Sequence, residues 1–203
     1  MATPRNHRVW LAGGVLATAA LAGCSAGMEG TPYPVEPAAS SLSQRAKATE
    51  LPARPAELPV AGVDPCALLS QPQLAQLKIT AAPRPTTEQQ GGPVCVLDAK
   101  DAEPFFAYHV RVIGADVTEW LTGARRKNSM TTQPKPVGGF PAITNYRAVG
   151  TPADCETLVG VAAGQTLAVQ AFAITAGAFT QPRLCEMSGQ AADLALQTLK
   201  ARN

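Results

Sequence analysis

The chain has few histidines, few aromatic residues and no dominant sign of charge. Two of its 203 residues are histidine, 5% are aromatic, and 17 basic residues face 15 acidic ones. A balanced charge does not supply the basic surface that nucleic-acid binding requires, so nucleic acid is not an expected partner. The scarcity of histidine leaves few groups for acid–base chemistry near neutral pH.

An apolar stretch near the N-terminus is too short to span a membrane. It covers 14 positions, 9–22, whereas a spanning helix needs roughly 20. Arg5 and Arg8 precede it, and small residues follow it. This pattern predicts an export signal over residues 1–23, which is removed from the exported protein.

The residues Leu21, Ala22, Gly23 and Cys24 close this stretch. They resemble the lipobox of bacterial prolipoproteins, in which diacylglycerol is attached to the cysteine and the signal is cut just before it. The resemblance implies that Cys24 carries two acyl chains, enough for stable anchoring, and that the protein is held at the cell membrane on its extracytoplasmic side. An ordinary export signal with an unrelated cysteine is the alternative.

Residues 24–62 are rich in proline, alanine, serine and glutamate and have no periodic apolar pattern. Such a segment cannot bury enough apolar surface to offset the entropy of ordering it. We therefore expect a lipidated cysteine followed by a semi-extended tether that holds the folded part clear of the membrane surface.

Residues 63–203 are expected to form one domain of about 140 residues. Capping residues at Asp64 and Ser70 predict a pair of short helices. Apolar periodicity predicts strands at 94–100, 105–113, 142–148, 155–162 and 165–174 and further helices at 116–127 and 182–200. This order predicts an α+β fold, in which an antiparallel sheet of about five strands has helices packed on one face.

Four cysteines remain once Cys24 is assigned to the anchor: Cys66, Cys95, Cys155 and Cys185. An even number in an exported domain predicts two disulfides, for which three pairings are possible. We favour Cys66 with Cys95 and Cys155 with Cys185, because each pair joins the start of an expected helix to the start of a nearby strand. A metal site is the alternative, but the chain has no Cys-x-x-Cys pair, so neither a metal nor a cofactor is expected.

These features together resemble a known family. The opening Asp-Pro-Cys-Ala-Leu-Leu-Ser at 64–70, a cysteine before a strand at Cys95, the late Cys155 and Cys185, and a closing alanine-rich helix are similar to actinobacterial envelope lipoproteins, mycobacterial members among them, that share a domain of unknown function. The resemblance spans residues 63–203 and implies a location in the cell envelope and a fold. Because that family has no agreed activity, the resemblance implies no catalytic residue.

His109 is the one histidine left after removal of the signal, so any histidine-dependent catalysis must use it. It falls within an expected strand beside Arg111, and the chain has no Gly-x-Ser-x-Gly turn, so we interpret it as a half-exposed strand residue. Asp98, Asp101 and Glu103 lack the spacing of a calcium loop and are expected in an exposed turn. We therefore expect no catalytic residue and no enzymatic activity.

Arg125, Arg126 and Lys127 close the helix expected at 116–127. Cations are favourable at the negative end of a helix dipole, which we take as their role. An anion-binding patch is the alternative.

Two functions are compatible with these observations. We expect a membrane-anchored, non-enzymatic binding or interaction module that docks an envelope protein or a cell-wall component. The alternative is a carrier that holds a lipid or another apolar small ligand between the sheet and its helices. Small residues such as Ala162, Ala168 and Ala171 along the expected hairpin would leave room for such a ligand.

Replacement of Cys24 with alanine tests the anchor. The variant should lose diacylglycerol labelling and leave the membrane fraction, because the thiol that carries the lipid is gone. Detergent partitioning of the wild-type and variant chains measures this, and a variant that still partitions fully into detergent would contradict the assignment.

Overall fold

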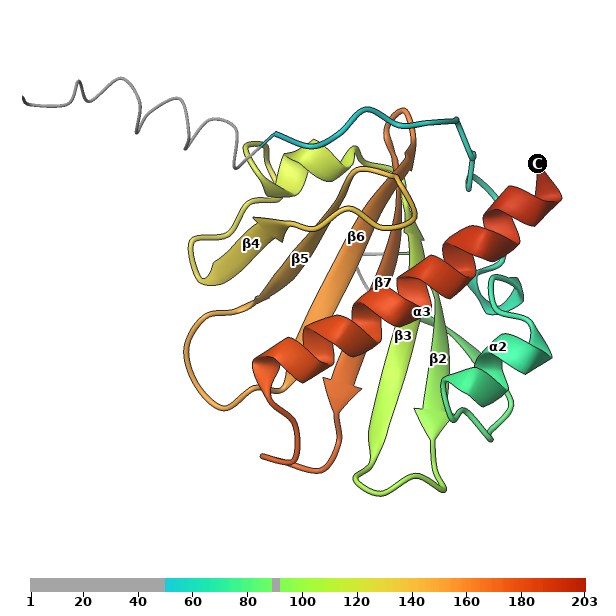
Figure 1. Ribbon diagram of the computed structural model, residues 1–203, viewed down its shortest axis with the longest axis vertical. Helices are drawn as coiled ribbons and strands as arrows, with labels where there is room; N and C mark the ends of the chain where they lie inside the picture. Colours follow the sequence, from blue (N-terminus) through green and yellow to red (C-terminus); the bar gives the residue numbers. More distant parts are fainter. Residues whose placement is uncertain (1–49, 89–91) are drawn as a thin grey trace, which may run out of the picture. The chain divides into compact units, whose positions relative to one another are not determined.

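Seven strands form one antiparallel sheet in the computed structural model, which describes residues 50–88 and 92–203 (Figure 1). Their order across the sheet is β1-β2-β3-β7-β6-β5-β4. The strands are β1 Arg84–Glu88, β2 Gly92–Ala99, β3 Phe106–Ile113, β4 Met130–Pro134, β5 Ala142–Arg147, β6 Asp154–Ala162 and β7 Gln165–Ala173. The predicted signal, Cys24 and residues 25–49 of the predicted tether lie outside the described residues.

The five predicted strands are present as β2, β3, β5, β6 and β7, but the sheet has two more at its edges. These are β1, Arg-Pro-Thr-Thr-Glu, and β4, Met-Thr-Thr-Gln-Pro. Both are short and polar and contain a proline, which is tolerated where one side of a strand has no hydrogen-bonding neighbour. The prediction of about five strands is therefore wrong, because edge strands lack the apolar alternation that identifies a strand.

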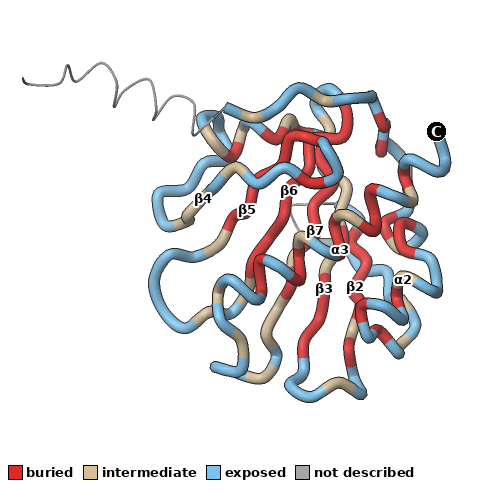
Figure 2. The backbone as a smooth tube through the Cα atoms, in the orientation of Figure 1, coloured by how far each residue is buried: buried red, intermediate tan, exposed pale blue. Residues whose placement is uncertain are grey.

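The long helix α3, Gln181–Arg202, crosses one face of the sheet and packs on β6 and β7 (Figure 1). Thr180 caps it and Pro182 stands in its first turn, in agreement with the helix predicted for 182–200. Figure 2 shows that burial is concentrated along the central strands and on parts of α3. Among the described residues, no helix combines the length and the hydropathy needed to cross a membrane.

The predicted helix at 116–127 is a single 3-10 turn, η2, Val117–Trp120. The chain turns back at Gly123, where a Cβ atom would lie 2.7 Å from the Cα of Glu119. Val117 and Trp120 pack with Leu158 of β6, whereas Val159 belongs to the core beneath α3. Because neighbouring residues of a strand point to opposite faces, η2 covers the face opposite α3, and the expectation that the helices share one face is wrong.

The two disulfides have the expected pairing. Cys66 bonds to Cys95 and ties the 3-10 turn η1, Pro65–Ala67, to β2. Cys155 bonds to Cys185 and ties β6 to the first turns of α3. The short helix α2, Gln71–Gln76, follows η1 and carries the predicted capping box, with Ser70 at the cap and Gln73 three residues later.

Residues 51–62, which we expected in the tether, pack along one end of the sheet. Leu58 and Val60 are buried in the main core. The N–H of Leu58 donates to the carbonyl of Val161 at 2.8 Å, and the N–H of Val60 donates to Oε1 of Gln165 at 2.7 Å. The folded domain therefore begins before residue 63, because the side chains of Leu58 and Val60 are part of its core.

Replacement of Leu58 with alanine should lower the free energy of unfolding by about 2 to 5 kcal/mol, the usual cost of removing a buried leucine side chain. Urea unfolding of the full chain measures it. The matched control is Val149→Ala, at a site 81% exposed, which should change stability by less than about 0.5 kcal/mol. Equal stabilities of the two variants would show that residues 51–62 are a tether after all.

Candidate functional site

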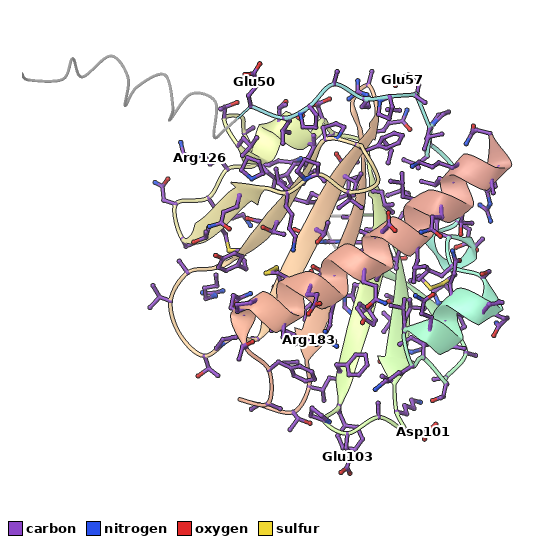
Figure 3. The ribbon with its side chains drawn as sticks, viewed as in Figure 1. Glu50, Glu57, Asp101, Glu103, Arg126 and Arg183 are labelled. Carbon is purple, nitrogen blue, oxygen red and sulfur yellow. A yellow bond between two sulfur atoms is a disulfide. The ribbon has the colours of Figure 1, made fainter. Side chains whose placement is uncertain are left out.

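The acidic residues that the sequence analysis considered as a calcium loop do not form a metal site. Asp98 pairs with Arg84 of β1, with Nη2 of Arg84 3.2 Å from Oδ2 of Asp98. Asp101 and Glu103 lie in the loop between β2 and β3 (Figure 3). Within the described ranges, no three His, Cys, Asp or Glu residues are grouped so that they could hold a metal ion.

The three consecutive cations follow the short turn η2 instead of ending a helix. Nε of Arg125 lies 3.4 Å from Oε2 of Glu119, and its guanidinium carbon lies 5.0 Å from the centre of the Trp120 ring. Arg126 and Lys127 are exposed. A local ion pair and a cation–π contact therefore account for Arg125, and the predicted role at a helix end is wrong.

A row of polar side chains crosses the sheet on the face opposite α3. The strand registers place these residues side by side on β3, β7, β6, β5 and β4: His109, Gln170, Glu156, Asn145 and Thr132. Thr132 Oγ1 donates to Oδ1 of Asn145 at 3.0 Å, and the side chain of Asn145 hydrogen-bonds to Glu156. His109 contacts Phe172, with ring centroids 4.5 Å apart. We call these five residues the polar row.

Glu156 is the buried centre of the polar row and forms an ion pair with Arg111 of β3. Burial raises the pKa of Glu156 above its ordinary value, and it outweighs Arg111 and Asn145, which lower this pKa. Because β7 lies between β3 and β6, the Arg111–Glu156 pair links two strands that are not neighbours. The ion pair therefore bridges β3 and β6 across β7, and its sequence signal was a charged residue within each of two strands.

A groove opens beside α3 at the end of the sheet where β2 turns into β3. It has a volume of about 370 Å³ and is lined by α2, the β2–β3 loop, residues 178–179 and the N-terminal half of α3. Its apolar lining includes Leu77, Phe106, Tyr108, Phe179 and Met187. We call this cavity the end groove.

The aromatic side chains of the end groove pack edge to face. The ring centroid of Phe106 is 5.7 Å from that of Tyr108 and 6.0 Å from that of Phe179. Burial raises the pKa of Tyr108 to about 12, although the charge of Arg183 lowers it. The phenol therefore stays protonated at neutral pH and is able to donate a hydrogen bond. Figure 3 shows Arg183 on the first turns of α3 and Glu103 in the β2–β3 loop.

A larger cavity of about 610 Å³ lies where residues 60–65 meet the ends of β3 and β7. Its polar side chains Asp64 and Gln165 are engaged in hydrogen bonds to backbone N–H groups. Asp64 accepts the N–H of Cys66 at 2.9 Å, and Oε1 of Gln165 accepts the N–H groups of Val60 and Ala61. The end groove is the better candidate site, because small-molecule sites combine apolar walls with a few polar groups directed at the ligand.

Sequence reasoning did not find the end groove. The alternation of Phe106 and Tyr108 predicted a strand, and the helical spacing of Met187 predicted a core position. No local pattern relates these residues to Phe179 or to Leu77, which come from other elements. The cavity is therefore recognisable only in the tertiary structure.

The fold and its two disulfides define a small disulfide-stabilised α+β domain with a long helix across an antiparallel sheet. The chain belongs to the family of proteins of unknown function called DUF3558, whose model matches residues 19–198. No curated protein and no solved structure matches the chain.

The raised pKa of Glu156 makes stability depend on pH. The folded chain binds this proton more tightly than the unfolded chain, so the contribution is fully present below the ordinary pKa of 4.5 and is lost as the pH rises through the folded pKa. Glu156→Gln should flatten the decline in the free energy of unfolding above pH 4.5, measured by urea unfolding at a series of pH values. The control is Asp101→Asn, at an exposed loop position, which should keep the wild-type slope. An unchanged slope in Glu156→Gln would contradict the assignment.

Proposed function

We propose that this protein is an extracytoplasmic lipoprotein of the actinobacterial envelope type, anchored to the cell membrane through Cys24, and that its domain is a non-enzymatic binding module. The signal pattern and the Leu-Ala-Gly-Cys sequence support the anchor. The two disulfides support an oxidising compartment, since such bonds persist outside the cytoplasm.

The observation that carries the binding function is the end groove. It is an open cavity with an aromatic wall, and its size lies in the lower part of the range of about 300 to 1,000 Å³ that is usual for ligand sites. Phe105 and Ile174 lie at the same end of the sheet and are 40% and 59% exposed. The N–H of Ile174 donates to the carbonyl of Phe105 at 3.0 Å, which holds the two residues together. This end of the domain therefore presents apolar surface, which is typical of interaction sites.

The partner of such a module is an envelope protein or a cell-wall component. The second candidate function is a carrier of a lipid or another apolar small ligand. Beneath α3, the facing side chains of the helix and of β6 and β7 are buried in one core cluster. A carried ligand would therefore occupy the end groove beside α3.

Photo-crosslinking from inside the end groove tests the proposal. A photoreactive amino acid replaces Ala178, an exposed residue that lines the groove, in the full chain in its own host. The control carries the same amino acid at Val149, which is exposed and lies outside the lining. We expect an adduct from position 178 in excess of any adduct from position 149, because only the groove holds an occupant.

The mass of the adduct decides between the two candidate functions. A protein-sized adduct identifies an interaction module, and a small-molecule adduct identifies a carrier. Equal labelling from the two positions would show that the end groove is empty in the envelope and would refute the proposal.

A further inference from the structure

We infer that the end groove binds a single-chain amphiphilic anion, whose apolar chain lies against Phe106, Tyr108 and Phe179 and whose acidic head is held by Lys78 and Arg183. The inference rests on the second candidate function, the carrier, and names the ligand class of the same groove. The shared chemistry is one alkyl chain with a carboxylate or phosphate head.

The charges of the end groove favour an anion. Its charged side chains are Lys78 just after α2, Arg183 on α3 and Glu103 in the β2–β3 loop. Among the lining side chains two cations face one acid beside an apolar wall, and Glu186, which pairs with Arg183, lies outside the lining. A neutral apolar ligand would use only the wall, whereas an amphiphilic anion uses both features.

Lys78 occupies a backbone position that usually takes another residue. It ends α2 with φ 59°, the left-handed region that glycine and asparagine adopt most readily. The N–H of Lys78 donates to Ala75 at 3.0 Å, and the N–H of Ile79 donates to Leu74 at 2.9 Å, so the turn is an ordinary helix end. Nothing in this turn requires a lysine side chain, and its position at the end groove accounts for it.

Arg183 likewise occupies a position in its helix that is electrostatically unfavourable for a cation. It stands in the first turn of α3, which holds no acidic residue, and the helix dipole there is unfavourable for a cation. Its ion pair with Glu186, at 2.7 Å, joins two side chains that are both more than half exposed. Such a pair contributes little to stability. An acidic head in the end groove would offset the unfavourable position of Arg183.

The volume of the end groove fits a ligand with a single alkyl chain. At about 370 Å³ it lies near the lower limit of ligand cavities, and Phe106, Tyr108 and Phe179 form a continuous aromatic wall within it. A protonated phenol at Tyr108 adds a hydrogen-bond donor near the guanidinium of Arg183.

Calorimetric titration with three ligands of the same chain length tests the inference: decanoate, decyl phosphate and decanol. The protein is the full chain with Cys24→Ala, expressed in an oxidising compartment. We expect at least one of the two anions to bind about tenfold more tightly than decanol or better, the ratio that one charge-assisted hydrogen bond supplies. Decanoate and decyl phosphate distinguish a carboxylate head from a phosphate head.

The decisive variant is Lys78→Asn, because asparagine tolerates the left-handed backbone and removes the charge. It should keep the wild-type circular dichroism spectrum, weaken binding of the preferred anion about tenfold and leave decanol binding unchanged. Arg183→Gln should act in the same way. Lys127→Asn, at an exposed lysine that does not line the groove, should change neither affinity.

Two results would overturn the inference: anions that bind no more tightly than decanol, or a Lys78→Asn variant that weakens decanol and the anions equally. If decanol binds as well as the anions and an adduct forms from position 178, the binding function stands and only the choice of an anion fails. If none of the three ligands binds and position 178 gives no adduct, both proposals fail.

Discussion

The structure depends on the close packing of α3 against β6 and β7. A small residue of the helix meets the sheet directly: the hydroxyl oxygens of Ser188 on α3 and Thr157 on β6 are 2.8 Å apart and buried. The disulfide between Cys155 and Cys185 joins the same two elements. Of the hairpin alanines, Ala171 belongs to the core beneath α3, where the helix fills the space that a small side chain leaves, whereas Ala168 packs with η2 on the other face.

The position of α3 also determines the shape of the end groove. Arg183, Met187 and Gln190 follow one another at helical spacing and line one wall. Gln73 of α2 donates from Nε2 to the carbonyl of Leu194 at 2.9 Å, and its Oε1 accepts the hydroxyl of Thr198 at 3.0 Å. These bonds fix α2, and with it Lys78, against α3. Helix α3 therefore carries Arg183 and, through its bonds to α2, fixes the position of Lys78.

The two ends of the domain differ in structure. Figure 3 shows Glu50 and Glu57 at one end and Asp101 and Glu103 at the other. The segment 51–62 is fastened at the first end, where the N–H of Ala163 donates to Oε2 of Glu57 at 2.7 Å. The end groove opens at the second. The described chain therefore begins, at Glu50, at the end of the domain remote from the end groove.

The sequence by itself determined the features that depend on local patterns, namely the five inner strands and the closing helix. It left three disulfide pairings open, and the structure has the pairing that was favoured. Only the tertiary structure decided the rest. The edge strands β1 and β4 are recruited by hydrogen bonds to their neighbours and not by apolar alternation. Glu156 meets Arg111 across an intervening strand, and Lys78 and Arg183 reach one cavity from two helices. Local sequence patterns do not predict contacts between residues that are distant in the chain, because such residues come together only when the sheet and helices pack.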